Sequence, residues 1–472
     1  MKKLLIIVAL VLCLLLIAGV LVNLRVDREE VTQRVQDEMH DMLGLRVEFD
    51  QPLSFSLWRG PQLHVGAVTL VSEEETVATA ERALVRFRVW PLLRGDIQVQ
   101  TVLLDAPELH VERIGDGEFK PSLAGRGEAD LQPLSIPRLR VRDAVIHFYD
   151  RPGDREWLFQ HCRLRADDIT HAGGSQAEWF GSLALEGELV CERVEQGRLV
   201  ATDVAVEISG RDGELVFEPL TGAAFAGQVN GRLDVDLTQQ PPQYSLQVGL
   251  DDFSLDEFMA TLDEGQEASG RMALRLELEG EGDDWLQLRQ SAAGKLSLEA
   301  NELVLYGVDL DEELDSYAAT QRFNLVDVGA VFLAGPLGLA ASRGYSFTGM
   351  LQRSGEQTAI TAMSSEWSIA EGIAKAEDVA MRTEKSRVAV AGELDFIEYA
   401  FADLRVAVVD VDGCAVIEQR INGRFQGPEV ESPNVLVEAI GPVLDLVDRG
   451  LRALDAEGGC EVFYDGSIEH PQ

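Results

Sequence analysis

The sequence predicts a mainly β fold, in which an N-terminal transmembrane helix precedes an elongated antiparallel β-sheet with a few capping helices. Three observations support this prediction: an uncharged apolar run near the N-terminus, an alternation of apolar and polar residues along most of the chain, and Asp-Gly and Asn-Gly pairs between the alternating segments. Alternation with a period of two indicates strands that bury one face. Asp-Gly and Asn-Gly supply the positive φ angles of tight hairpins.

The apolar run from Leu4 to Val22 contains no charged residue. A run of about 20 apolar residues is long enough to cross a bilayer as a helix. Lys2 and Lys3 precede it, so the positive-inside tendency favours a cytoplasmic N-terminus at residues 1–3 and a translocated remainder. A cleaved signal peptide is one alternative, although its apolar core is usually about 7–15 residues long. Lipidation of Cys13, in the middle of the run, is another; we expect an uncleaved, single-pass anchor.

Composition limits the partners of the translocated part. The 472 residues include 41 Lys and Arg against 81 Asp and Glu, which gives a net charge of −40. A surface of this sign repels phosphate backbones, so we expect no nucleic-acid partner. It also repels anionic headgroups, which argues against broad electrostatic adhesion to a membrane. We interpret the acidity as a solubility feature. The hydrophobic content of 46% is sufficient for a sizeable core.

The elements expected after the anchor follow in order. Residues 27–43 predict a helix, because apolar residues recur at three- and four-residue steps from Val31 to Met42. It caps the folded body or, alternatively, lies along the membrane surface, which its acidic residues disfavour. From Leu45 the period changes to two. The clearest strands are expected at Val65–Val71, Val85–Val89, Ile97–Thr101, Leu139–Val141, Val145–Phe148, Leu183–Leu185, Val204–Ile208, Leu233–Leu237, Leu246–Leu250, Leu274–Leu278, Leu296–Leu298, Val388–Val390 and Val406–Val408.

Turn pairs divide these strands into consecutive hairpins, and four segments predict helices. The last helical segment carries an apolar stripe that packs against the sheet or, alternatively, contacts a membrane or a partner. Residues 124–137 and 263–270 are rich in glycine and polar residues and mark candidate boundaries. The turn pairs are Asp116-Gly117, Asp212-Gly213, Asn230-Gly231, Asp412-Gly413, Asn422-Gly423 and Asp465-Gly466, and the helical segments are Ser254–Leu262, Asp283–Gln290, Asp311–Thr320 and Pro433–Leu454.

No catalytic motif stands out. The G-x-S-x-G elbow, the phosphate-binding P-loop and a G-x-G-x-x-G following a strand are all missing from the sequence. Asp410 and Asp412-Gly413 resemble the opening of a calcium loop, but without the spacing and closing Glu of an EF-hand, so a hairpin turn is expected. We therefore assign no catalytic, cofactor-binding or metal-binding residue. We interpret as ordinary strand or surface residues the histidines His40, His64, His110, His147, His161, His171 and His470.

Four cysteines follow the one in the anchor: Cys162, Cys191, Cys414 and Cys460. They would be in an oxidising compartment if the chain faces a bacterial periplasm. Four cysteines allow three pairings, and the residues alone leave the choice open. No C-x-x-C pair occurs, so neither a zinc knuckle nor a thioredoxin-type site is expected.

Several blocks together resemble the AsmA family, although none would suffice alone. They cover most of the chain and include a P-L-L-x-G-x-I block that would open a strand. The blocks are Ser56-Leu57-Trp58-Arg59-Gly60-Pro61, Trp90-Pro91-Leu92-Leu93-Arg94-Gly95-Asp96-Ile97, Leu104–Leu109, Gly270–Leu276, Phe323–Gly338, Ile421-Asn422-Gly423-Arg424-Phe425 and Cys460–Ile468.

The resemblance implies an inner-membrane protein that faces the periplasm of Gram-negative bacteria. It also implies a long β-sheet that curls into a groove with an apolar concave face, and a bridge between Cys414 and Cys460. The chain would then divide into an anchor at 4–22, a capping helix at 23–44, an AsmA-like β region at 45–130, a central elongated β-groove at 131–400 and a C-terminal module with an amphipathic helix at 401–472.

We therefore expect a non-enzymatic protein that handles phospholipids in a hydrophobic β-groove and contributes to lipid transport toward the outer membrane and to envelope biogenesis. It would need no cofactor, and other envelope proteins are candidate partners. The alternative is an assembly factor that holds outer-membrane protein strands by β-augmentation. An anchored enzyme is the least favoured hypothesis. Because the sequence does not show which face points inward, no groove residue is assigned.

Overall fold

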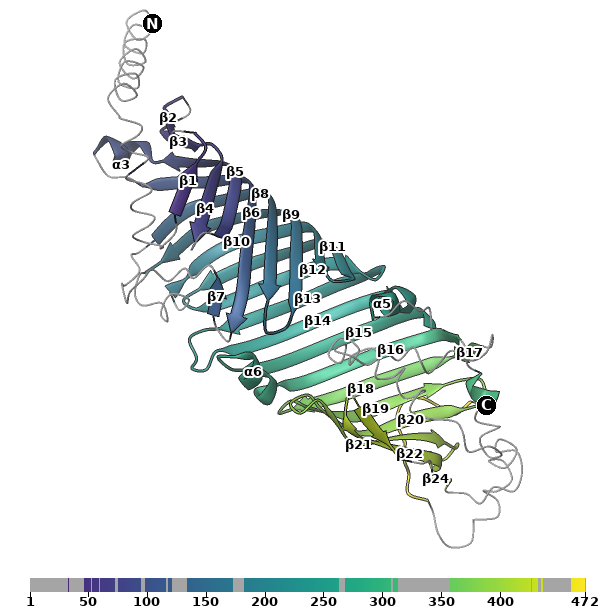
Figure 1. The fold of residues 1–472 in the computed structure, drawn as a ribbon. Helices are drawn as coiled ribbons and strands as arrows, with labels where there is room; N and C mark the ends of the chain where they lie inside the picture. Colours follow the sequence, from purple (N-terminus) through teal and green to yellow (C-terminus); the bar gives the residue numbers. More distant parts are fainter. Residues whose placement is uncertain are drawn as a thin grey trace, which may run out of the picture. The chain divides into compact units, whose positions relative to one another are not determined.

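The computed structural model is mainly β, as predicted (Figure 1). The expected anchor lies outside the described residues, and so does the expected capping helix apart from Gln33, which is helical. Within the described ranges, no helix is both long and apolar enough to span a membrane. The structure describes residues 33, 46–51, 53–58, 60–72, 75–94, 98–115, 118–120, 134–172, 182–262, 268–306, 309–312, 357–425, 427–431, 434–435 and 460–471.

The chain forms two compact units. Unit 1 extends to Leu220 and includes Val235–Gln239, whereas unit 2 comprises Thr221–Asp234 and the chain from Gln240 onward. The elements up to the first boundary are β1 (Arg46–Phe49), β2 (Ser54–Ser56), β3 (Gln62–Val65), β4 (Val68–Ser72), β5 (Glu75–Phe87), α3 (Val89–Leu93), β6 (Val99–Gly115), β7 (Glu118–Lys120), β8 (Leu134–Asp150), β9 (Arg155–His171), β10 (Ala184–Gln196), β11 (Leu199–Arg211) and the start of β12 (Glu214–Ala224).

Unit 1 is an open ladder with the strand order β1, β4, β5, β6, β8, β9, β10, β11, to which the short strands add the pairings of β2 with β3, of β3 with β5 and of β7 with β6. All of them are antiparallel except the pairing of β6 with β8, whose register sets His110 beside His147. After β6 the chain first forms a hairpin as expected, because β7 (Glu118–Lys120) pairs antiparallel with β6 on the other side of Asp116-Gly117. The expectation of consecutive hairpins is wrong at the next step, because β8 is a parallel neighbour of β6, and a tight turn cannot connect parallel strands.

Four of the long strands of unit 1 contain a residue with positive φ near their middle. These residues are Ala106 in β6, Asp143 in β8, His161 in β9 and Asp203 in β11, and the register of β8 against β9 shifts around Asp143. These residues form a row that runs across the strands. Within it, Oδ1 of Asp143 in β8 lies 2.6 Å from Nδ1 of His161 in β9. Such β-bulges bend a strand and increase its twist. The row therefore creases the sheet, and its long strands fold over toward one face (Figure 1).

Unit 2 is a second open, antiparallel ladder, running β14, β15, β16, β18, β19, β20, β21, β22. Its other strands pair at the margins, β17 with β16 and both β23 and β24 with β22. The elements are β13 (Gly227–Asp236), β14 (Gln243–Ser254), α5 (Leu255–Leu262), β15 (Ala268–Glu281), α6 (Trp285–Ser291), β16 (Ala293–Tyr306), β17 (Gln357–Ile360), β18 (Ala362–Ala370), β19 (Ile373–Arg382), β20 (Arg387–Asp395), β21 (Ala400–Val409), β22 (Ala415–Arg424), β23 (Gly427–Val430) and β24 (Asn434–Val435).

Two of the four expected helices are confirmed as α5 and α6. The side chain of Asp284 caps α6 by accepting a hydrogen bond from the backbone N–H of Gln287. Of the segment expected at 311–320, residues 311–312 are helical and the rest lies outside the described residues. The helix expected at 433–454 is wrong at its start, because Asn434 and Val435 pair with β22 as β24. The remainder of that segment also lies outside the described residues.

The turn predictions differ in outcome. Asp212-Gly213 joins β11 to β12 with φ angles of 52° and 87°, and Asp412-Gly413 lies between β21 and β22, as predicted. Asn230-Gly231 is instead inside β13, where a Cβ on Gly231 would lie 2.8 Å from the carbonyl oxygen of Gln247. That glycine permits close strand packing. Asn422-Gly423 likewise lies within β22.

Two strand predictions near the N-terminus also need correction. The segment Val65–Val71 is broken at Gly66-Ala67 into β3 and β4, both of which pair with β5. The Pro91-Leu92-Leu93 block does not open a strand, because it lies in α3 and β6 begins at Val99. In both places a short turn or helix replaces a regular continuation of the alternating pattern.

Candidate apolar binding face

Alternation along β14, β15 and β16 gives these strands one apolar face and one charged face. Leu246, Val248 and Leu250 stand opposite Leu278, Leu276 and Leu274, and the row continues onto Leu296 and Leu298 of β16. The intervening positions carry Glu277, Glu279, Lys295 and Glu299, all of them exposed. Since paired residues share a face, the leucines form a continuous apolar surface within unit 2.

Burial of this surface increases along unit 2. Leu246, Leu276 and Leu278 are only partly buried, whereas Leu298 and Leu404 are 0% exposed. From β16 onward the apolar side chains pack on one another in a filled core that includes Leu303, Leu305, Ile360, Met363, Trp367, Met381, Val388, Val406 and Ile417. The part of this face with exposed apolar surface is therefore at β14 and β15.

An aromatic cluster bounds the apolar face next to α5. The ring of Phe258 lies 5.3 Å from that of Phe225 and 6.1 Å from that of Phe253 between centroids, both in edge-on geometry. Phe253 and Phe258 are buried. Edge-on aromatic packing stabilises such clusters beyond simple burial, so α5 closes the strand ends with its own side chains.

In unit 1 the apolar face surrounds a disulfide. Cys162 of β9 and Cys191 of β10 are bonded, with Cα atoms 4.0 Å apart, and both are buried. Ala144 and Val194 are buried against them. Around this centre lie apolar side chains that remain partly exposed, namely Val141, Trp157, Phe159, Leu189, Ala201 and Val204. The face thus has a small, rigid centre and a broad margin of accessible hydrocarbon.

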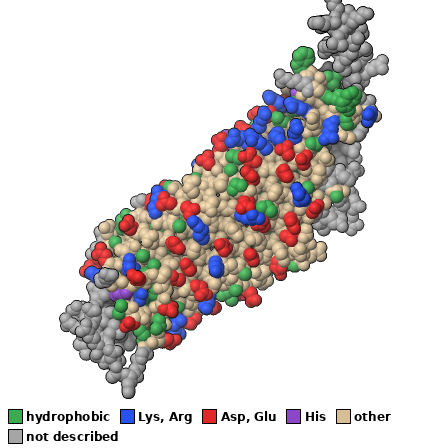
Figure 2. Space-filling model, turned by 180° about the vertical axis from the view of Figure 1, so that it is seen from behind, with side chains coloured by type: hydrophobic (Ala, Val, Ile, Leu, Met, Phe, Trp, Pro, Cys, Tyr) green, Lys and Arg blue, Asp and Glu red, His purple; other side chains and the backbone are tan. Residues whose placement is uncertain are grey.

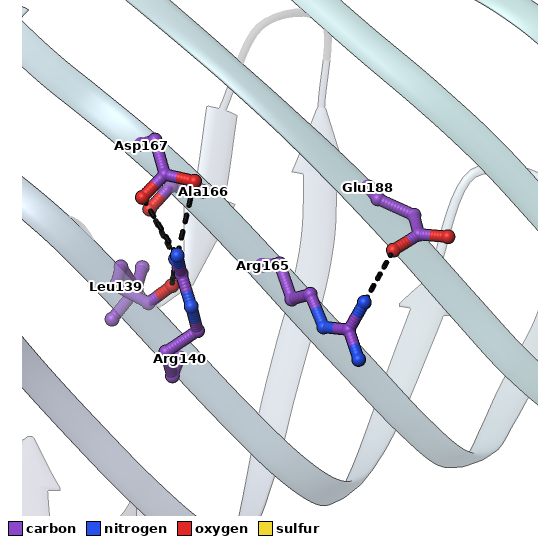
Figure 3. Close-up of polar contacts among 6 residues, drawn as sticks. All are labelled: Leu139, Arg140, Arg165, Ala166, Asp167 and Glu188. Carbon is purple, nitrogen blue, oxygen red and sulfur yellow. Dashed lines mark hydrogen bonds and ion pairs between the residues drawn. The ribbon is translucent and has the colours of Figure 1, made fainter.

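The opposite face of the same strands carries ion pairs (Figure 3). Nη2 of Arg140 in β8 lies 2.7 and 3.0 Å from the two carboxylate oxygens of Asp167 in β9. Arg165 reaches Glu188 of β10 at 3.3 Å. Acidic and basic side chains are mixed over the surface shown in Figure 2. Exposed pairs of this kind contribute little stability, but they identify this as the water-facing side of the creased sheet, with the apolar cluster on its inner side.

Exposed apolar residues also gather at one edge of unit 1. Trp58 and Trp90 are 79% and 75% exposed, and Leu57 and Val89 are exposed beside them in the chain. The backbone N–H of Phe87 donates to the carbonyl oxygen of Pro61, which holds the β2–β3 turn and the start of α3 at the same edge. We call Leu57, Trp58, Val89 and Trp90 the tryptophan edge. Exposed arginines accompany it at positions 86, 88 and 94.

The C-terminal segment, residues 460–471, is fixed to β19–β22. Cys414 and Cys460, the pair implied by the family resemblance, are joined by a disulfide. The Tyr464 hydroxyl donates to Oδ1 of Asp378 over 2.5 Å; burial, and then this hydrogen bond, raise the pKa of Tyr464. Tyr464 packs with Ile468 against alanines of β19, β20 and β21. Both faces of these three strands are therefore covered.

Asp410 and the histidines are the other candidate site residues of the sequence. Oδ1 of Asp410 accepts backbone hydrogen bonds from Asp412 and Cys414, so this aspartate shapes a hairpin turn, as predicted. His161 pairs with Asp143. His40 lies outside the described residues. His110 and His147, which are far apart in sequence, lie side by side.

A family comparison agrees with this architecture. The model of the AsmA family matches residues 1–124 and 177–378. No curated protein and no solved structure matches the chain. The family match covers more than half of the sequence and includes the leucine-lined strands β14, β15 and β16, and the chain therefore belongs to the AsmA family.

Proposed function

We propose that this protein is a non-enzymatic, inner-membrane-anchored periplasmic protein that holds phospholipid acyl chains against its apolar faces and contributes to lipid transport toward the outer membrane. The observation that carries this proposal is the margin of partly exposed apolar side chains around the Cys162–Cys191 disulfide. Apolar surface in contact with water costs about 25 cal/mol per Å² relative to burial. An acyl chain laid on this face would recover part of that free energy.

The chemistry of the face suits a hydrocarbon guest. The cluster consists of apolar side chains and the disulfide, so a guest gains contacts through burial without needing a hydrogen-bond partner. The charged groups of these strands, such as Arg140 and Arg165, are on the other side. This separation supports passive holding of acyl chains. The leucine rows of β14 and β15 provide a second surface of the same kind within unit 2.

The tryptophan edge supports a membrane position for unit 1. Tryptophan is enriched at the membrane–water interface because its ring is amphipathic, and nearby arginines attract anionic headgroups over a short range. We propose that Trp58 and Trp90 sit at the inner membrane, into which residues 4–22 insert. The positive charge is local to this edge and leaves the strongly acidic remainder of the chain free in the periplasm.

A photo-crosslinking amino acid placed at Phe159 on the inner face of the full-length chain in cells tests the proposal. Phospholipid should be recovered by mass spectrometry from this position but not from the matched outer position Arg165. Equal lipid recovery from both positions would contradict the proposal. Recovery of unfolded outer-membrane protein strands in place of lipid would favour the assembly-factor function.

A further inference from the structure

Three residues that can bind metal ions meet on the outer face of unit 1. Glu108 and His110 are two residues apart on β6, so their side chains project to the same side of the strand. His147 of β8 is the parallel register partner of His110. The two imidazole rings are stacked, with centroids 4.7 Å apart and planes inclined by 14°. The cluster therefore arises from the parallel pairing of β6 with β8.

The donor atoms of the cluster are close enough to share one ion. Oε1 of Glu108 lies 3.5 Å from Nε2 of His110 and 3.4 Å from Nε2 of His147. One ligand atom from each residue lies within 4.8 Å of the other two. In a tetrahedral zinc site with bonds of about 2.0–2.1 Å, neighbouring donor atoms are roughly 3.3 Å apart. The carboxylate oxygen of Glu108 is thus about as far from each imidazole nitrogen as two ligand atoms of one zinc ion are from each other.

A second carboxylate stands behind one of the rings. Nδ1 of His147 lies 3.6 Å from Oε1 of Glu156 in β9, on the ring edge away from Glu108. Metal-bound histidines usually donate their other N–H to such a carboxylate, which sets the tautomer and orients the ring. With Nδ1 protonated toward Glu156, Nε2 of His147 presents its lone pair to the cluster.

The partners of Glu108 distinguish it from neighbouring acids on the same strands. Asp105 lies against Arg82 and Arg142, and Asp150 lies against Arg113, so arginines balance these carboxylates. The contacts of Glu108 are with two imidazoles instead. A divalent ion would bind this carboxylate and the two neutral rings together.

We propose that Glu108, His110 and His147 form a binding site for a divalent transition-metal ion, best matched by Zn²⁺. Two imidazoles and one carboxylate suit zinc, whereas Mg²⁺ and Ca²⁺ prefer oxygen ligands alone. The side chains of Glu108, His110 and His147 are 48%, 46% and 29% exposed. An ion can therefore enter from solvent and keep a water molecule as its fourth ligand. The bound ion would clamp the parallel β6–β8 pair across its crossover connection.

The test uses the purified, metal-stripped full-length chain and Zn²⁺ as the probe in isothermal titration calorimetry. We expect one zinc ion per wild-type chain and an affinity lower by tenfold or more in H110A and in H147A. The control is H161A, which removes another exposed histidine with a carboxylate partner, Asp143, and should bind zinc as the wild type does. Equal binding by all four proteins would overturn the proposal.

Substitution with Co²⁺ gives a second readout that does not depend on variants. Co²⁺ bound to the wild-type chain should show the intense visible absorption bands of a tetrahedral site, and added Zn²⁺ should remove them. Weak bands of an octahedral, mainly aqueous ion would overturn the tetrahedral site even if H110A or H147A failed to fold. Binding to the wild type that survives in the H110A/H147A double variant would assign the ion to another place on this acidic surface.

Discussion

Cys162 and Cys191 are bonded across two adjacent strands at the centre of the inner face of unit 1, one residue from the positive-φ His161 that marks the crease in β9. The disulfide therefore fixes β9 to β10 where the strands bend. Its sulfur atoms also form the floor of the apolar cluster. Fold stability and the shape of the candidate lipid-binding face depend on the same bond.

Replacing both cysteines in C162A/C191A should destabilise unit 1. The two residues are 29 apart in sequence, and the chain-entropy model gives about 3–4 kcal/mol for a loop of this length. Urea denaturation followed by circular dichroism measures the change. The matched control is C414A/C460A, which should act on unit 2 only. An unchanged unit 1 transition in C162A/C191A would show that the strand ladder alone holds the crease.

A carboxylate on the inner face should expel lipid. Leu189 belongs to the apolar cluster, whereas Val190 is opposite Arg163 in the register and shares its outward side. An unpaired charge is costly in an apolar site, so L189D should retain roughly tenfold less co-purifying phospholipid than the wild type. V190D adds the same charge on the outer face and should retain lipid normally. Equal losses in the two variants would place the lipid elsewhere.

Removing the tryptophan edge should weaken binding to membranes. We expect W58A/W90A, in the chain from residue 24 onward, to bind vesicles containing anionic phospholipid about tenfold more weakly in co-sedimentation, because two interfacial rings are lost. W285A, which removes an exposed tryptophan from α6, is the control and should bind normally. Binding should also fall with added salt if the arginines contribute. Unchanged binding by W58A/W90A would contradict a membrane position for this edge.

The Tyr464–Asp378 hydrogen bond should make unit 2 sensitive to alkali. The pKa of Tyr464 is raised in the folded chain by burial and by this bond, so its stabilising effect is fully present below the unfolded pKa of about 10. That effect is lost as the pH rises from about 10 toward the folded pKa. Urea denaturation at pH 8 to 11 should show the wild type losing stability above pH 10.

Y464F is the matched variant for the alkaline experiment. It lacks the hydroxyl and should be about 1–3 kcal/mol less stable than the wild type at pH 8, because the hydrogen bond to Asp378 is lost. Its advantage is that position 464 no longer ionises, so the stability difference between the two proteins should shrink above pH 10. A constant difference across this range would mean that the Tyr464 hydroxyl does not couple to folding.

Local patterns predicted the parts of the fold that depend on neighbouring residues. The leucine alternation of Leu274–Leu278 predicted a strand with one apolar and one polar face. Asp212-Gly213 predicted the hairpin between β11 and β12. Asn230-Gly231 carries the same local signal as Asp212-Gly213, but close packing of β13 on β14 uses its glycine differently. A turn signal reports only which φ angles a residue tolerates, and tertiary packing decides how they are used.

The candidate sites depended on information that no local pattern contains. Glu108-x-His110 is a pair of ligand residues at strand spacing, a signal that could have been noticed, but its partner His147 arrives only through the parallel register. The pairing of Cys162 with Cys191 follows from β9 lying beside β10. Alternation also cannot distinguish an accessible apolar face from a filled core, because Leu276 and Leu298 have equivalent sequence surroundings and different burial.

The double covering of β19, β20 and β21 has a consequence for any guest of unit 2. The core fills one face of these strands, and residues 460–471 cover the alanines on the other. A hydrocarbon chain that lies along the leucine rows of β14 and β15 would find little exposed apolar surface on this face of the described strands from β16 onward, because the side chains there already pack on one another. Within the described part of unit 2, contacts with a guest would then be confined to β14 and β15, so these strands would hold a guest in place instead of passing it on toward β22.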